Sequence, residues 1–270
     1  MVVQHNLTSM NANRQLGITT NAQAKSTEKL SSGYRINRAG DDAAGLTISE
    51  KMRSQIRGLN KASANAEDGI SLIQTAEGAL NEAHSILQRM NELATQAAND
   101  TNTSADRTAI QKEIDALTSE IDRIASTTQF NTMNLISGSF TGKNLQVGAL
   151  KGQKIKISIE AMNASALGVN SLSVASFTKA GSAMTKIQAA ISSVSTQRSA
   201  LGALQNRLEH TVANLDTTSE NTSAAESRIR DTDMAEEMVN YSKNNILAQA
   251  GQSMLAQANQ STQGVLSLLG

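Results

Sequence analysis

The residues that could carry out chemistry are few, and they are scattered along the chain. The histidines His5, His84 and His210 lie in separate segments, and no carboxylate follows any of them at the spacing of a metal-ligand set. His84 falls one residue from an apolar stripe described below, which favours a structural role. Asp41 and Asp42 could form a catalytic pair, but they also fit a helix N-cap, where the helix dipole favours negative charge.

Other catalytic and ligand-binding signatures are also missing. The stretch GSFTGKN, residues 138–144, superficially resembles a phosphate-binding loop, but its glycines are one residue too close and no Ser or Thr follows Lys143. A turn is the better interpretation. We find no nucleophile elbow and no glycine fingerprint after a strand, and the chain has no cysteine. We therefore expect no enzyme activity, with no catalytic residue, cofactor or metal.

The composition of the chain argues against several kinds of binding partner. The 24 basic and 24 acidic residues are well mixed and give a formal net charge of zero, so we expect no nucleic-acid binding. No apolar run approaches the roughly 18 residues of a membrane span, so we expect no membrane insertion. The first residues, MVVQHNLTSMNANRQLG, show no cleavable signal. The absence of proline leaves helices uninterrupted, and 2% aromatic residues argue against an ordinary thick core.

The stretch from Gly45 to about Ala97 predicts one long helix. Two columns spaced by seven residues are apolar or small throughout, and the second column lies three residues after the first. The first column is Leu59, Ala66, Ile73, Leu80, Leu87 and Ala94, and the second is Ala62, Gly69, Ala76, Ala83, Met90 and Ala97. This 4-3 spacing is typical of a coiled-coil helix, which needs partner helices to bury its stripe.

The rest of the chain supplies such partners. Ser104 is expected to cap a second helix that returns antiparallel to the first, with a seam from Ile110 to Ile124. Ile155, Ile157 and Ile159 alternate with polar residues and predict a strand, paired with residues 145–147 in the only β-like region. Helical spacing resumes over residues 184–215, and a polar stretch then precedes a last helix from about Asp231.

The two ends of the chain are expected to pair with each other. Residues 2–32 carry only a thin apolar stripe that stops at Gly33, whereas the ending VLSLLG is unusually apolar for a free terminus. The predicted fold is mainly α, a long antiparallel coiled-coil-like bundle with a small β-hairpin near residues 140–160 and paired terminal helices. The expected parts are residues 1–40 with a linker, a rod at 41–225, and 226–270.

A mixed apolar and charged patch is expected on the outside of the long helix. Arg89, Glu92 and Gln96 project away from the seam, and Leu93 lies on its flank. Such a patch is either a solvated face or a contact surface. Spacing alone leaves both interpretations open.

Several long stretches resemble bacterial flagellin. KLSSGYRINRAGDDAAGLTISEKMRSQIRGL, NAEDGISLIQTAEGALNE and LQRMNELATQAAN are similar to its N-terminal region, and the last 44 residues, from SRIRDTDM to VLSLLG, are similar to its C-terminal region. With QFNTMNLISG, the resemblance covers roughly residues 1–140 and 181–270. Thr262 and Gly270 depart from the family's usual ending. The variable outer domains common in the family are absent.

The resemblance implies a secreted, extracellular subunit of the flagellar filament. It would be exported unfolded through the flagellar type III apparatus and polymerise under the filament cap, with an export chaperone as a further partner. The termini would form the inner core of the tube. Apolar residues of those ends are the expected polymerisation core: Leu7, Met10, Leu247, Met254, Leu255, Val265, Leu266, Leu268 and Leu269.

The resemblance also implies a receptor contact. In the family, a QRxxEL motif binds the flagellin-sensing Toll-like receptor of vertebrates. Met90 and Asn91 fill the two spacer positions. The expected receptor or subunit interface is Gln88, Arg89, Glu92, Leu93, Gln96 and Glu113. Two alternatives to a filament subunit stay open, a hook–filament junction protein and a coiled-coil adaptor outside any filament.

Overall fold

The computed structural model describes the backbone of residues 6–269 and the side chains of residues 6–261. Within this range the chain is mainly helical. The helices are α1 (Leu7–Ser32), α2 (Ala43–Ala97), α3 (Ser104–Thr127), α4 (Phe177–Arg230) and α5 (Met234–Leu269). The strands β1 (Gln129–Phe130) and β2 (Met133–Asn134) form one antiparallel pair, and β3 (Lys143–Gln146) and β4 (Lys154–Ile157) form another.

The described chain divides into two compact units. The first, called the terminal unit here, contains the residues up to 54 together with those from 221 onward. The second, called the rod unit, is Gln55–Glu220. Helices α2 and α4 contribute to both units.

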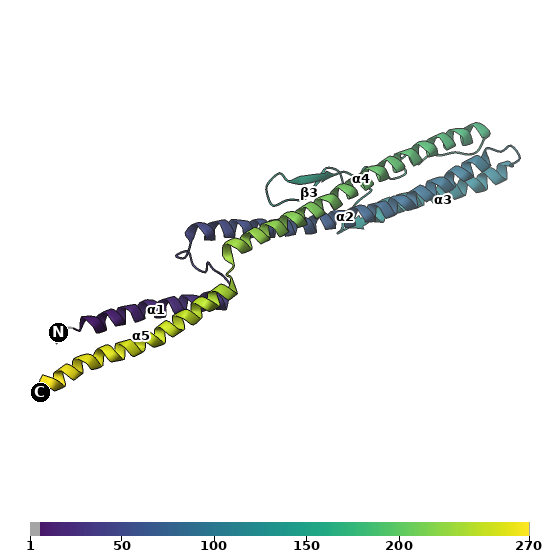
Figure 1. Cartoon of the computed structure of the whole chain (residues 1–270). Coiled ribbons are helices and arrows are strands. Elements are labelled where there is room, and N and C mark those ends of the chain that lie inside the picture. The colour runs from purple at the N-terminus through teal and green to yellow at the C-terminus, as the bar shows by residue number, and fades with distance from the viewer. Residues whose placement is uncertain (1–5, 270) are drawn as a thin grey trace. The chain divides into compact units, whose positions relative to one another are not determined.

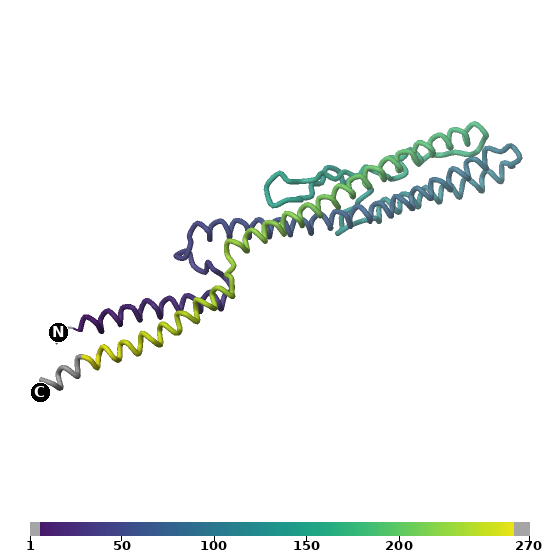
Figure 2. The backbone as a smooth tube through the Cα atoms, viewed as in Figure 1, coloured from purple at the N-terminus to yellow at the C-terminus, as the bar shows by residue number. Residues whose placement is uncertain are grey.

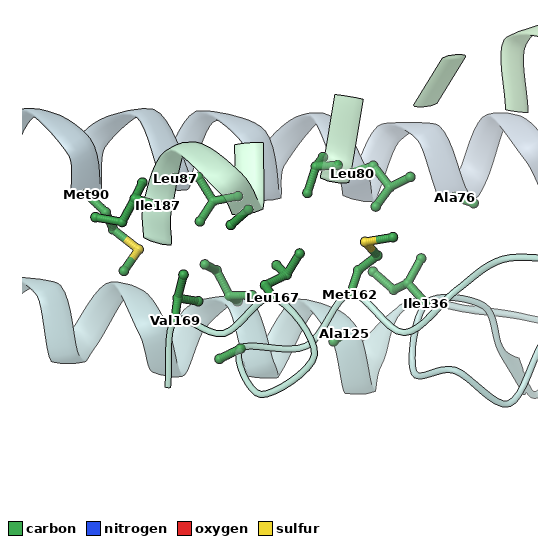
Figure 3. Packing of buried hydrophobic residues seen from close by; sticks show 14 of the residues in the cluster. Ala76, Leu80, Leu87, Met90, Ala125, Ile136, Met162, Leu167, Val169 and Ile187 are labelled. Carbon is green, nitrogen blue, oxygen red and sulfur yellow. The ribbon is translucent and has the colours of Figure 1, made fainter. Parts of the chain in front are cut away.

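The seam of α2 is buried along its whole predicted length. All twelve residues of its two columns are buried in the rod unit, from Leu59 to Ala97. Figure 3 shows part of this core, where Leu80, Leu87 and Met90 of α2 meet Ile187 of α4 and residues of the connecting loops. The predicted coiled-coil-like bundle is thereby confirmed.

Helix α3 returns antiparallel to α2, as predicted. The Arg107 Nε atom donates to the carbonyl oxygen of Ala97 at 3.0 Å, where the two helices meet at the turn. The expected cap at Ser104 is wrong by one residue, because Thr103 is the N-cap and α3 begins at Ser104. In a reciprocal capping box, the Thr103 hydroxyl accepts from the Asp106 amide at 3.3 Å and the Asp106 carboxylate accepts from the Thr103 amide at 2.8 Å. The same hydroxyl also donates to the Asp106 carboxylate at 2.7 Å. The hydroxyl's hydrogen bond holds the pKa of Asp106 below its ordinary value.

The predicted hairpin forms, but it is not the only β structure in the described chain. In β3–β4, Leu145 pairs with Ile155, and Ile155 and Ile157 face the core. The additional pair β1–β2 turns through Asn131 and Thr132 at φ of 46° and 63°. A strand of two residues is too short to show an alternating pattern, which is why periodicity did not reveal it.

The irregular segment between residues 135 and 174 packs into the core of the rod unit. Its buried apolar side chains are Leu135, Ile136, Phe140, Ile155, Ile157, Ile159, Met162, Ala164, Leu167, Val169, Leu172 and Val174. This segment therefore contributes to the same hydrophobic core as α2, α3 and α4.

Helix α4 completes the rod unit. Val194, Leu201, Leu208 and Leu215 are buried at intervals of seven residues, as the helical spacing predicts. The polar stretch after Leu215 is helical as well, and α4 continues to Arg230. The final helix then begins at Met234, close to the expected start.

The predicted pairing of the terminal helices is confirmed in the terminal unit. Helices α1 and α5 run side by side and antiparallel (Figures 1 and 2), with the start of α1 beside Ala258 and its end beside Glu237. Helix α1 stops at Gly33, whose left-handed φ of 75° and amide bond to Lys29 form a C-cap. The carboxylate of Asp42 accepts the Gly45 amide at 2.8 Å, which confirms an aspartate at the start of α2.

Candidate interaction surfaces

The α1–α5 pair is in contact along its length, but it buries few side chains completely. Asn6 donates to the Ala258 carbonyl at 2.9 Å, and the hydroxyl of Ser9 donates to Asn259 at 2.7 Å. Among the described side chains of the two helices, only Ser26 and Ala248 are buried. A pair of helices with so little buried apolar area gains little from its own packing.

Where the loop after α1 meets the junction of α4 and α5, several polar contacts hold the chain together. The Arg35 amide donates to the Arg230 carbonyl at 2.7 Å, and the Thr232 amide donates to the Gly33 carbonyl at 3.0 Å. The Arg230 guanidinium lies 4.5 Å from the centre of the Tyr34 ring and 3.2 Å from the Glu50 carboxylate. These contacts fix the base from which the α1–α5 pair extends.

The exposed surfaces of α1 and α5 are rich in large apolar side chains. Nine of the fourteen large hydrophobic side chains that are exposed among the described residues lie on these two helices. They are Leu7, Met10, Ile18, Met234, Met238, Val239, Ile246, Leu247 and Met254, which we call the terminal apolar face. Exposed fractions run from 48% for Met234 to 70% for Leu7. Concentrated apolar exposure of this kind usually marks an interface.

The expected polymerisation core agrees with the terminal apolar face only in part. Leu7, Met10, Leu247 and Met254 belong to it, whereas Leu255 is half-buried. The side chains of Val265, Leu266, Leu268 and Leu269 lie outside the described residues. Val239 and Ile246 were missed by sequence reasoning, although their spacing of seven residues parallels that of Leu247 and Met254.

A second surface is built around Arg89 on the rod unit. The Arg89 guanidinium contacts Glu113 of α3 through Nε at 3.1 Å and Nη2 at 3.0 Å, and Glu92 through Nη1 at 3.2 Å. These hydrogen bonds, that with Glu113 foremost, raise the pKa of Arg89. Gln88 contacts the His84 ring at 3.1 Å, and Gln96 is exposed. Exposed ion pairs add little to the free energy of folding. The Arg89 cluster is therefore not needed for stability and is available to contact another molecule.

The expected outward position of Leu93 is wrong. Its side chain is only 2% exposed and belongs to the core of the rod unit. The buried side of α2 is wider than the two predicted seam columns. Leu72 and Leu93, which lie beside those columns, are buried as well. The structure therefore brings Gln88, Arg89, Glu92, Gln96 and Glu113 to the surface and removes Leu93 from it.

The described residues contain no group of three or more His, Asp or Glu side chains arranged to hold a metal ion. Within the same range, no helix combines the length and the apolar character that crossing a membrane requires.

Comparison with known proteins identifies relatives over the full chain. The family model for the bacterial flagellin N-terminal helical region matches residues 3–141, and that for the C-terminal helical region matches residues 184–269. A flagellin of Halalkalibacterium halodurans is 56% identical over 271 residues, covering 100% of both chains. The flagellar filament 31.3 kDa core protein of Treponema maltophilum is 52% identical over 285 residues, again covering 100% of both. The crystal structure of Bacillus cereus flagellin has a TM-score of 0.52 at 30% identity, covering 60% of this chain and 94% of that one.

Proposed function

The chain belongs to the bacterial flagellin family and is a structural subunit of the flagellar filament, and we propose that it polymerises through the terminal apolar face. The observation that carries this proposal is the concentration of exposed apolar side chains on α1 and α5, whose described residues include one fully buried apolar side chain, Ala248. Full-length identity to flagellins favours this function over a hook–filament junction protein or an adaptor.

The proposal gives the two units different positions in the filament. Residues 1–40 and 226–270, which belong to the terminal unit, would form the inner core of the filament, and residues 41–225, which include the rod unit, would form the shell packed around it. A subunit placed in an extracellular filament must be exported, so an export chaperone and the filament cap are the further partners of this proposal.

Replacing two residues of the terminal apolar face tests the polymerisation surface. Leu247→Asp with Met254→Asp should prevent filament growth from added seeds, because each buried leucine or methionine contributes about 1.5–3 kcal/mol to a contact. Both side chains are exposed in the single chain, so its helicity should not change. The matched control is Gln249→Asp with Gln252→Asp, which adds the same charge at two exposed positions that carry no large apolar group. Normal filaments from the first variant, seen by electron microscopy, would rule out this surface.

We also propose that the Arg89 cluster is recognised by the flagellin-sensing Toll-like receptor. The cluster is exposed, charged and not required by the core, and Gln88, Arg89, Glu92, Gln96 and Glu113 are its residues. Leu93 does not belong to this exposed cluster, but its buried side chain anchors the same turn of α2 in the core.

Replacing Arg89 separates recognition from folding. Arg89→Ala should weaken receptor binding, since it removes the group that holds Glu92 and Glu113 together, while the urea unfolding midpoint stays the same. Arg123→Ala, which breaks a similar exposed pair with Glu120, is the control. Unchanged receptor affinity in surface plasmon resonance would exclude the cluster as the recognition site.

A further inference from the structure

Methionine is the side chain through which an oxidant can change this protein most readily. The chain has ten methionines, and it has neither cysteine nor tryptophan. A peroxide converts the methionine thioether to a sulfoxide, which turns a flexible apolar side chain into a polar one. The effect of this change depends on where the accessible methionines lie.

The described methionines differ sharply in exposure. Met90 and Met162 are buried in the core of the rod unit (Figure 3). Five of the described methionines are exposed, and four of these five belong to the terminal apolar face. The four are Met10, Met234, Met238 and Met254, which we call the face methionines. The fifth is Met133 of β2, in the rod unit. Folding therefore protects the core thioethers and leaves exposed ones mainly on the surface through which we propose that the chain polymerises.

The face methionines are distributed over both terminal helices. Met234 and Met238 are four residues apart on α5, so they lie on one side of its first turns. Met254 follows Leu247 by seven residues and shares its side of α5. Met10 lies in the first turns of α1. Oxidation would therefore place polar groups at several points of the terminal apolar face rather than at one edge.

The sulfur atoms of the face methionines are open to attack. None of them accepts a hydrogen bond within the described chain, whereas the sulfur of the half-buried Met184 accepts one from the Thr95 hydroxyl at 3.3 Å. A sulfur lone pair attacks one oxygen of hydrogen peroxide, and the O–O bond breaks as the S–O bond forms. The departing hydroxide takes the proton of the transferred oxygen and leaves as water. Sulfur is oxidised by two electrons, and the peroxide is reduced.

We propose that the face methionines are modification sites through which a peroxide blocks assembly of the single chain by converting them to sulfoxides. A sulfoxide oxygen accepts hydrogen bonds from water, and covering it with apolar side chains would remove those bonds without replacing them. A filament that covers the face would protect the same thioethers, so assembled chains would keep their contacts. Methionine sulfoxide reductases restore the thioether, which makes the block reversible. The inference rests on the proposed polymerisation through the terminal apolar face and adds its sensitivity to oxidation.

Peroxide treatment of the single chain, followed by catalase and then by seeded polymerisation, tests this proposal. The variant M10L/M234L/M238L/M254L keeps the four positions apolar but removes their sulfur atoms. M133L is the matched control, because it removes the exposed methionine that lies outside the terminal apolar face. For each chain we would measure the critical concentration before and after treatment and the sulfoxide content of each methionine by mass spectrometry. Circular dichroism checks folding.

Treatment should raise the critical concentration of the wild type and of M133L at least about tenfold, because several apolar contacts become polar. The four-leucine chain should change little relative to its own untreated sample. Sulfoxide should appear at the face methionines of the treated wild type and not at Met90 or Met162. The two epimer-specific reductases, added together, should restore polymerisation of the treated wild type. Peroxide added to finished filaments should oxidise the face methionines much more slowly than in the single chain.

The proposal is wrong if wild type with sulfoxide at all four face methionines keeps its critical concentration, or if treatment inhibits the four-leucine chain as strongly as the wild type. It is also wrong if the reductases remove the sulfoxides without restoring polymerisation. This last arm uses the unaltered chain, so it decides the question even if the four-leucine chain assembles poorly. None of these outcomes contradicts the proposed function, which fails separately if the Leu247→Asp, Met254→Asp chain forms filaments.

Discussion

Leu93 and Arg89 lie one helical turn apart on α2, and their surroundings give them different roles. The Leu93 side chain is buried in the core of the rod unit, whereas the Arg89 side chain is 52% exposed and is held by two carboxylates. A motif that contains both residues therefore combines a structural anchor with a contact group. Substitutions at the two positions should be distinguishable by their effect on folding alone.

Leu93→Ala should lower the free energy of unfolding by about 2–5 kcal/mol, because it leaves a cavity at a fully buried position of the core. Urea unfolding followed by circular dichroism measures this. Gln96→Ala, one turn further and exposed, is the control and should have almost no effect. A Leu93→Ala protein as stable as the control would mean that Leu93 is not part of the core.

At the scale of elements, α3 depends on its first turn, where Thr103 and Asp106 cap each other. The Thr103 hydroxyl donates to the Asp106 carboxylate at 2.7 Å and accepts from the Asp106 amide at 3.3 Å. Since the pKa of Asp106 is lower in the folded chain than in the unfolded one, its ionised form favours folding. This contribution is complete above the ordinary aspartate pKa of about 3.9 and is lost as the pH falls through the folded value.

Thr103→Ala should therefore lower the thermal unfolding midpoint at pH 7 by removing the cap, and the difference from the wild type should shrink below about pH 4. Thr108→Ala is the control, because its hydroxyl bonds the Ser104 carbonyl within the helix and caps nothing. Thermal melts at several pH values give both differences. A difference that stays constant down to about pH 2 would show that Asp106 is not involved.

The helices could be predicted from the sequence because a seven-residue period repeats over most of them. All twelve seam residues of α2 are buried, and the cap of α3 is misplaced by only one position. The seven-residue period identifies two buried columns of α2, however, and it does not show whether neighbouring positions are buried as well. That is why Leu93 was expected on the outside.

Other parts of the fold carry no periodic signal. The core residues between Leu135 and Val174 are spaced irregularly, because each is positioned by the helices around it rather than by its own element. The alternation at Ile155 and Ile157 is the exception, and it correctly predicted the strand β4. Contacts between copies require knowledge of which side chains folding leaves exposed.

At the scale of the whole molecule, the two units leave different surfaces uncovered. The terminal unit exposes apolar side chains on two helices that bury little between them, whereas the rod unit has a continuous core and exposes mainly charge. We expect the apolar surface to supply most of the free energy of polymerisation. This surface would then be covered in the filament and accessible in the single chain.

Cysteine labelling at Ile246 tests the central claim most directly, because the chain has no native cysteine and the Ile246 side chain is 67% exposed. An Ile246→Cys protein should react rapidly with a thiol reagent as the single chain and at least about a hundredfold more slowly in filaments, as expected for a group that is reached only when a contact worth about 2.7 kcal/mol opens. Labelling in denaturant gives the fully accessible reference. Equal labelling rates in the single chain and the filament would contradict the assignment of the terminal apolar face to the interior of the polymer.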